Sequence, residues 1–172
     1  MKLPRAPKAS TAAVRKRMQA VRQRDTLAEV LIRRSLYAQG VRYRVHRRPL
    51  PDLNRRADIV FVGRRVAVFI HGCFWHRCPK HGSTPCTNGH WWKEKLKENE
   101  RRDRETVRLL RRARWRVLVV WEHEAPSIAV RRIMKVLREA SDGAADTRKQ
   151  IADRGIRRAT RRHGVNTPVA AL

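Results

Sequence analysis

The sequence feature that most constrains this chain is a short apolar run that ends abruptly in metal-ligating and acid–base side chains. Residues 66–70 read Val-Ala-Val-Phe-Ile, a pattern typical of a buried β-strand. Residues 71–81 then hold three histidines and two cysteines, interrupted by the aromatic pair Phe74-Trp75. A strand that ends in such groups presents them at the edge of a sheet, where functional residues collect, so we expect the site there.

The cysteines and one histidine of this segment have the spacing of a metal site. Cys73-x4-Cys78-x2-His81 is close to the spacing of structural zinc sites but supplies only three ligands, and His123, after a later apolar run, is the best candidate for the fourth. Two other candidate ligands remain open: Cys86 and His90. Thiolates and imidazoles in closed tetrahedral geometry select Zn²⁺ and leave no open position for catalysis. The spacing predicts a structural zinc; the alternative is a set of unrelated polar residues in a basic loop.

The rest of the chain alternates between helical and strand patterns. In chain order, periodicity and helix start and stop signals predict a helix at 26–40, strands at 41–45, 57–62 and 66–70, a helix at 89–114, a strand at 117–121 and a helix from 126 to about 141. Thr26-x-x-Glu29 is a capping box, which gives Glu29 a sufficient structural role, and Asn88 is expected to cap the long helix. A hairpin at Gly63 and a later strand that returns over a helix imply a mixed β-sheet flanked by helices, an α/β fold.

The charge of the chain limits its partners. Lys and Arg number 42 against 15 Asp and Glu, a net charge of +27, which indicates a polyanionic partner, nucleic acid first. No stretch approaches the about 18 apolar residues of a membrane span, and the basic N-terminus lacks the apolar region of a signal peptide. Three cysteines, two of them in zinc-like spacing, favour a reduced cytoplasmic protein over a disulfide-stapled one.

Composition divides the chain into three segments. Residues 1–24 carry eight basic and no acidic residues and are interpreted as a basic N-terminal arm, in which residues 15–23 fit a short helix. Residues 25–140 hold the periodic elements and are expected to form a single domain. Residues 141–172 are Arg-rich and without periodicity, so we expect a basic, disordered tail.

The groups that are not zinc ligands point to phosphodiester hydrolysis. His71 and His76 remain beside the predicted zinc site, and Asp58 sits among apolar residues at the start of the neighbouring strand. A carboxylate buried there needs a partner, for which a salt bridge to one of the many arginines is the simple explanation. A carboxylate that holds Mg²⁺ and a histidine that moves a proton near neutral pH are also what a metal-assisted nuclease requires. Asp58 and His76 are the candidates for those two roles.

The run His71-Gly72-Cys73-Phe74-Trp75-His76 resembles the signature of the very-short-patch repair (Vsr) endonucleases, a branch of the restriction-endonuclease-like superfamily. The similarity covers about residues 12–140. It includes four further segments: 26–29, 56–60, 92–104 and 115–123. The resemblance implies a single restriction-endonuclease-like domain, here residues 25–140, with a structural Zn²⁺ and a catalytic Mg²⁺. The activity it implies is strand-specific nicking of duplex DNA at T:G mismatches that arise when 5-methylcytosine deaminates.

Matching positions also imply roles for individual residues. Asp58 resembles the Mg²⁺ ligand and His76 the general base. Supporting active-site positions are matched by Glu29, His71 and Asp103. Zinc-ligand positions are matched by Cys73, Cys78, His81 and His123. Positions that contact DNA are matched by Met18, Phe74, Trp75, Trp92 and Asn99. The resemblance therefore adds a functional role to the structural one of Glu29.

Three departures from the family pattern are visible. Ala57 stands where a proline usually precedes the catalytic aspartate, and Cys86 lies in a loop where no cysteine is expected. Ile70 stands where a threonine is frequent, although its backbone carbonyl can still bind Mg²⁺.

The implied role of the aromatics is to wedge into the base stack beside the mismatch. Phe74 and Trp75 are adjacent, so in an extended segment their side chains point to opposite faces, which makes both hard to bury together. Trp92 is expected in the first turn of the long helix.

Two other functions remain open. The chain is alternatively a zinc-stabilised DNA-binding module without cleavage, or a restriction-type endonuclease acting on undamaged DNA. Intact Asp58, His76 and Glu29 argue against the first, and the aromatic residues argue against the second. We expect a monomer, nucleoid-associated when acting, that starts very-short-patch repair with mismatch-repair proteins as candidate partners.

Overall fold

The computed structural model describes residues 5–20 and 24–142, and the structural statements below concern those residues. Most of the predicted tail, from residue 143 on, and parts of the predicted arm therefore lie outside the described residues. Within the arm, α1 (Ala12–Ala20) is helical, slightly ahead of the helix predicted at 15–23. The division into arm, domain and tail stays a prediction.

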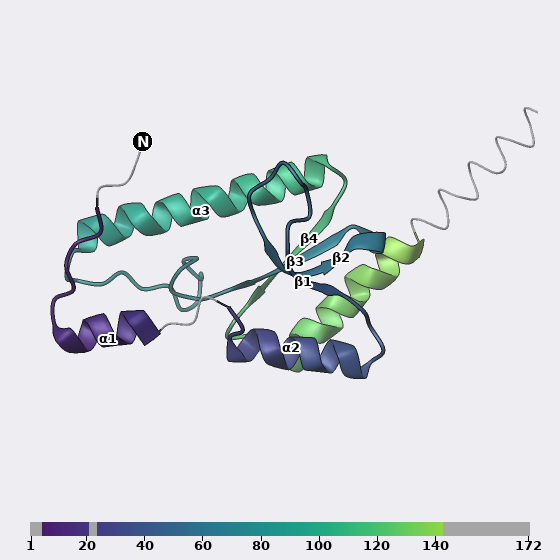
Figure 1. Ribbon diagram of the computed structural model, residues 1–172, viewed down its shortest axis with the longest axis horizontal. Coiled ribbons are helices and arrows are strands. Elements are labelled where there is room, and N and C mark those ends of the chain that lie inside the picture. The colour runs from purple at the N-terminus through teal and green to yellow at the C-terminus, as the bar shows by residue number, and fades with distance from the viewer. Residues whose placement is uncertain (1–4, 21–23, 143–172) are drawn as a thin grey trace, which may run out of the picture.

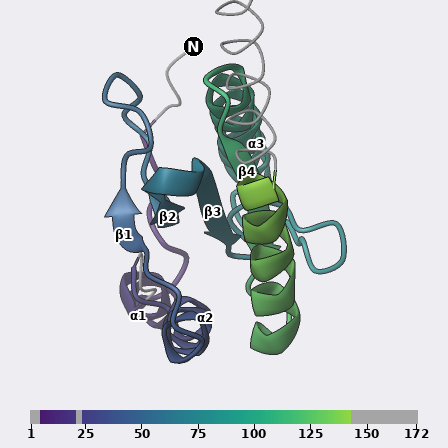
Figure 2. The same ribbon diagram turned by 90° about the vertical axis from the view of Figure 1, so that its right-hand side faces the viewer.

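The fold is a four-stranded mixed sheet with helices on both faces. Its elements are α2 (Leu27–Ala38), β1 (Arg44–Arg47), β2 (Ala57–Phe61), the 3₁₀ turn η1 (Val62–Arg64), β3 (Val66–His71), α3 (Gly89–Arg112), β4 (Arg116–Trp121) and a helix over residues 126–142. The strands lie in the order β1-β2-β3-β4, and they follow one another from β1 to β3 across the view of Figure 2. β1–β2 and β2–β3 are antiparallel and β3–β4 is parallel, so the predicted mixed α/β fold is confirmed.

Two apolar clusters hold the helices against the sheet. On one face, α2 and the helix over 126–142 pack against the strands, with Ile32, Leu36 and Ile133 fully buried. On the other face, α3 and the β1–β2 loop cover the sheet, with Leu110 and Trp115 in the core. Figure 1 shows α3 above the sheet and the other two helices below it. The first three residues of β3 are fully buried because both faces of this strand are covered, as its continuous apolar sequence predicts.

Two side-chain caps were predicted at helix starts, and the structure forms one of them. The Thr26 hydroxyl accepts the Glu29 N–H at 3.4 Å, so the predicted N-cap is confirmed. In return, the Glu29 carboxylate accepts the Thr26 hydroxyl at 3.0 Å and the Asp25 N–H at 3.1 Å. Asn88 does not cap α3 with its side chain, and that prediction was wrong. Its backbone is left-handed, with φ 57°, whereas a side-chain cap needs an extended backbone at that position.

The hairpin between β2 and β3 lies where it was predicted, around Gly63. The left-handed residue of the turn is Arg65, with φ 49°, immediately after η1. Among the described helices, none combines the length and the apolar character needed to cross a bilayer.

Candidate active site and metal centre

The parallel pairing of β3 and β4 brings the residues after both strands together. His71 pairs with Trp121, so the segment from Gly72 lies beside His123. The predicted zinc ligands meet there: the ligand atoms of Cys73, Cys78, His81 and His123 all lie within 4.8 Å of one another. The four sulfur-to-imidazole distances run from 3.1 to 4.0 Å. A tetrahedral zinc site with ordinary bond lengths spaces such atoms about 3.6 Å apart, so the donor set fits Zn²⁺.

The pKa values of the two thiols in this cluster are shifted in opposite directions. Burial and the neighbouring Cys78 raise the pKa of Cys73 to about 11. Cys78 is also desolvated, but its pKa is lowered because the backbone N–H groups of Lys80 and His81 stabilise the thiolate. A soft cation held between them would keep both sulfurs deprotonated. Cys86 is exposed and, like His90, is absent from the cluster.

Asp58 projects from β2 toward the end of β3. Its Oδ2 accepts the Ile70 N–H at 2.7 Å. Burial raises the pKa of Asp58 to about 6, and the nearby Glu29 carboxylate acts in the same direction. The salt bridge to an arginine considered from the sequence is not formed, since His46 is the one basic side chain within 4 Å of Asp58 in the described part of the chain. Asp58 is therefore a partly buried carboxylate that lacks a strong counter-charge, which is typical of a cation ligand.

A histidine–carboxylate pair faces Asp58 from the other side. His76 Nδ1 lies 2.6 Å from Asp103 Oδ2, so Asp103 holds the tautomer with a proton on Nδ1 and leaves Nε2 able to accept one. The His71 ring stacks on His76 with 3.9 Å between centroids. Burial and the neighbouring His76 lower the pKa of His71 to about 4, so His71 is neutral at physiological pH. The Asp103–His76 pair can therefore act as a general base, with His71 as an uncharged neighbour.

These groups share one cavity of about 930 Å³. It brings together every predicted catalytic residue and all but one of the predicted DNA contacts, from five elements and the loops between them. The predicted residues on its wall are Met18, Glu29, Asp58, Ile70, His71, Phe74, Trp75, His76, Asn99 and Asp103. Four basic side chains also line it: Arg55, Arg56, Lys95 and Arg102. Its wall thus combines acid–base groups, aromatic rings and cations.

The aromatic residues form one cluster rather than diverging. Residues 73–77 coil into a turn, so the expectation that Phe74 and Trp75 point to opposite faces was wrong. Their rings pack edge to face at 5.1 Å between centroids, and Trp92 lies 5.2 Å from Phe74 and 5.9 Å from Trp75. Asn99 donates to the Trp75 carbonyl at 3.0 Å and anchors the turn on α3.

Trp92, the predicted contact missing from the main cavity, lines a neighbouring one of about 470 Å³. Residues 6–10 and α1 form the other wall, and Figure 1 shows α1 at the end of the molecule where α3 begins. Met18 and Phe74 line both cavities, so the two are contiguous.

Two residues near the site were not singled out from the sequence. His46 lies between the Glu29 and Asp58 carboxylates. The Glu122 carboxylate accepts the Cys73 N–H, and the Glu122 N–H donates to the His71 carbonyl, which clamps the end of β3. His46 can be recognised as a site residue only when the pairing register of β1 with β2 is known. For Glu122, the one indication in the sequence is that it directly precedes the predicted ligand His123.

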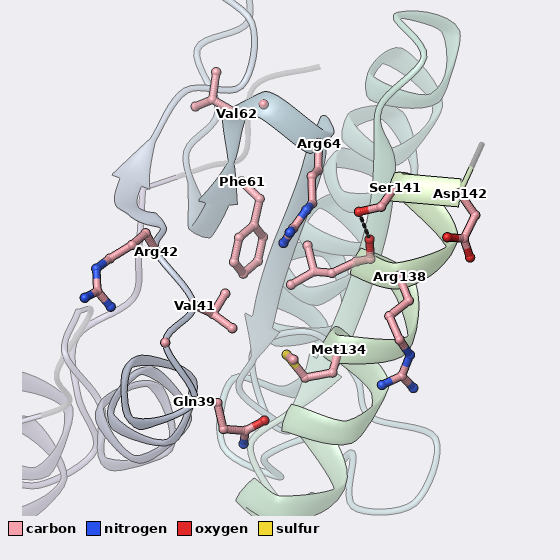
Figure 3. Close-up of a pocket in the computed structure, with 13 residues that line it drawn as sticks. Gln39, Val41, Arg42, Phe61, Val62, Arg64, Met134, Arg138, Ser141 and Asp142 are labelled. Atoms are coloured by element: carbon pink, nitrogen blue, oxygen red, sulfur yellow. Dashed lines mark hydrogen bonds between the residues drawn. The ribbon is translucent and has the colours of Figure 1, made fainter. Parts of the chain in front are cut away.

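A further pocket of about 600 Å³ lies away from these groups, between the β2–β3 turn and the helix over 126–142. Figure 3 shows Arg64 and Arg138 at this pocket. None of the predicted site residues lines it, so it provides a reference surface that also carries basic side chains.

A carboxylate that shares a cavity with a histidine–carboxylate pair, within a chain of net charge +27, fits a nuclease-type site. A family model described as DNA mismatch endonuclease Vsr matches residues 8–81. The type II nicking enzyme V.NaeI of Lentzea aerocolonigenes is 44% identical over 73% of this chain and 77% of its own length.

Two further relatives agree. The type II nicking enzyme V.NmeAIP of Neisseria meningitidis is 36% identical over 73% of this chain and 89% of its own length. The DNA mismatch endonuclease Vsr of Escherichia coli K12 is 39% identical over 62% of this chain and 67% of its own length. The chain belongs to the Vsr family and is a DNA endonuclease, a hydrolase of the mismatch or nicking type.

Proposed function

We propose that this endonuclease nicks one strand of duplex DNA at T:G mismatches left by deamination of 5-methylcytosine, and so starts very-short-patch repair. The observation that carries the proposal is the single cavity in which the Asp58 and His76–Asp103 groups adjoin the aromatic cluster. A hydrolytic centre beside a cluster of half-buried rings suits a substrate whose bases are already poorly stacked. We expect a monomer that acts on DNA in the cytoplasm, with mismatch-repair proteins as partners.

The hydrolytic step follows from the positions of the side chains. Asp58 and the Ile70 carbonyl oxygen would hold Mg²⁺, which would supply positive charge next to the scissile phosphate. His76 accepts the proton of the attacking water on Nε2, and Asp103 stabilises the imidazolium that results. His71, neutral and stacked on His76, adds no competing charge as that imidazolium forms. Glu29 lies on the Asp58 side of the cavity and orients water there.

The zinc cluster is proposed to be structural. Phe74, Trp75 and His76 lie between two of its ligands, Cys73 and Cys78, in the chain. These two ligands, with His81 and His123, would hold a Zn²⁺ ion that ties the turn to the end of β4. The general base and two of the three wedge residues would thereby be fixed in one rigid segment.

The direct test compares two duplexes that are identical except for one pair, T:G or C:G, each labelled on either strand. With Mg²⁺, we expect one nick in the T-containing strand of the mismatched duplex and none in the matched one. Tight binding without any nick would favour the DNA-binding module. Equal cleavage of both duplexes would favour a restriction-type enzyme.

The wedge role predicts a selective loss of activity. Trp75→Ala or Trp92→Ala should reduce nicking of the T:G duplex by about 5- to 150-fold, the effect of about 1–3 kcal/mol per lost stacking contact. Binding to matched DNA should change far less, because phosphate contacts dominate it. Single-turnover nicking and equilibrium binding measure the two effects. Tyr37→Ala is the control, since Tyr37 is an exposed ring on α2 that lines neither cavity.

Stability decides between a wedge and a core role for these rings. If the Trp75 and Trp92 variants melt well below the Tyr37 variant, or lose matched and mismatched binding equally, the rings are core residues.

The basic wall of the cavity predicts a localised salt dependence. The double variant Lys95→Gln/Arg102→Gln should bind DNA more weakly, and its plot of log affinity against log salt should be shallower by about one to two in slope. Arg64→Gln/Arg138→Gln removes the same charge at the reference pocket of Figure 3 and should keep the parent slope. Titrations between about 50 and 200 mM salt measure both. Equal slopes for the two double variants would place the DNA elsewhere.

A further inference from the structure

His46 occupies a position in the sheet that brings it to the acid groups of the site. The β1–β2 register pairs Val45 with Ile59 and Arg47 with Ala57, so His46 lies opposite Asp58. Its φ is 47°, in the left-handed region, although it lies within β1. A residue other than glycine rarely adopts this conformation inside a strand, and such outliers collect at functional sites.

The imidazole of His46 lies between two carboxylates. Its Nδ1 is 3.9 Å from Asp58 Oδ1, and its Nε2 is 3.7 Å from Glu29 Oε2. The ring is 21% exposed, while its Nε2 is buried and has no hydrogen-bond partner among residues 5–20 and 24–142. A buried nitrogen without a hydrogen-bond partner requires an explanation. A functional site that binds a water or an ion supplies one.

Both carboxylates have the His46 ring as a basic neighbour. Glu29 is buried and accepts the Thr26 hydroxyl and the Asp25 N–H, but His46 is the one basic side chain within 4 Å of it in the described part of the chain. The same holds for Asp58. Asp25 also approaches His46, at 3.8 Å, yet it has its own ion pair with Arg33 at 2.5 Å. The ring thus separates two acid groups that repel each other.

We propose that His46 is a positioning residue, which holds the Glu29 and Asp58 carboxylates at a fixed separation and so shapes the cation site at Asp58. This inference rests on the proposed function, because it takes Asp58 as the Mg²⁺ ligand. Groups that orient a metal ligand from behind typically change metal affinity or activity 10- to 100-fold when they are removed. Without the ring, both carboxylates gain room to rotate away from the geometry that a cation needs.

Substituting His46 by glycine tests the role of its side chain without changing its backbone conformation. His46→Gly removes the ring and adopts a positive φ without strain, so the variant should be at least as stable as the parent. We expect its Mg²⁺ affinity to fall about 10- to 100-fold. Its nicking rate at saturating Mg²⁺ should change much less. His46→Gln keeps a polar group of similar reach and should restore most of the affinity.

The measurements are Mg²⁺ and Mn²⁺ binding by calorimetry, the melting temperature, and nicking as a function of Mg²⁺ concentration. Arg65→Gly is the matched control, because Arg65 also has a left-handed backbone, with φ 49°, and lines neither the active-site cavity nor its neighbour. It should relieve the backbone in the same way and leave Mg²⁺ binding unchanged.

The outcomes distinguish the two proposals. A parent protein that neither binds Mg²⁺ nor nicks the T:G duplex overturns the proposed function and this inference with it. A parent that does both, with a His46→Gly variant of unchanged Mg²⁺ affinity, overturns the role of His46 alone. If the glycine variant does not fold, His46→Asn replaces it, since asparagine tolerates the left-handed backbone and is too short to lie between the carboxylates. Parent-like Mg²⁺ affinity in that variant likewise overturns the inference.

Discussion

Asp58→Asn should abolish nicking and at the same time stabilise the protein at neutral pH. The amide keeps the acceptor for the Ile70 N–H but removes the negative charge that is proposed to hold the cation. Loss of such an electrostatic group costs at least about 10²–10³-fold in rate. DNA binding should be retained or strengthened, because a negative charge facing the phosphate is lost.

The stabilisation follows from the pKa of Asp58, which burial raises to about 6. An unfolded aspartate titrates near 3.9, so between about pH 4 and pH 6 the folded chain holds a proton that the unfolded chain has released. Stability therefore falls as pH rises through this window and stays lower above it. At about 1.4 kcal/mol per factor of ten, the carboxylate costs about 3 kcal/mol at neutral pH.

Denaturant unfolding without metal, at pH values from about 3.5 to 8, measures this effect. The Asp58→Asn variant should exceed the parent by about 3 kcal/mol at pH 7 and match it below pH 4. Asp52→Asn is the control, since Asp52 is an exposed aspartate in the β1–β2 loop. A parent-like nicking rate for Asp58→Asn would place the active site elsewhere.

Loss of the metal cluster should have the largest effect on stability. Cys73→Ser, or removal of the metal with a chelator, should lower the melting temperature by about 10 °C or more, because structural zinc contributes a free energy comparable to that of the whole fold. Nicking should be lost as well, although none of the four ligands lines the active-site cavity. Elemental analysis should find one zinc per parent chain.

Cys86→Ser is the matched control for the metal cluster. Cys86 is an exposed cysteine outside the cluster, so its variant should keep the zinc, the melting temperature and the activity. A metal-free parent that melts at the same temperature as the zinc-bound protein would contradict a structural role for zinc.

The sequence predicted those features that depend on local pattern. An apolar run leading into Cys73, Cys78 and His81 keeps these ligands close in any fold, because they lie within a few residues of one another. His123 was within reach of prediction because parallel strands place their carboxyl ends side by side. Asp103 was expected near the site because it matches a supporting active-site position of the Vsr family, and it pairs with His76.

Features that depend on register and on turn conformation were not accessible. His46 lies in a run of basic residues, and a shift of one residue in the β1–β2 pairing would place it on the opposite face of the sheet. The aromatic pair was misjudged because the backbone after Gly72 coils: the His76 and Cys78 N–H groups donate to the Gly72 and Cys73 carbonyls. Residue types alone do not specify this turn.

Two of the three proposed wedge residues and the proposed general base share one turn, which has a consequence for how the enzyme fails. Phe74, Trp75 and His76 lie between the cluster ligands Cys73 and Cys78. Oxidation of either thiol would therefore loosen the turn that carries both the proposed wedge residues and the proposed general base. Such damage would remove site selection and cutting together, so the enzyme would lose its activity and would not become an indiscriminate nuclease.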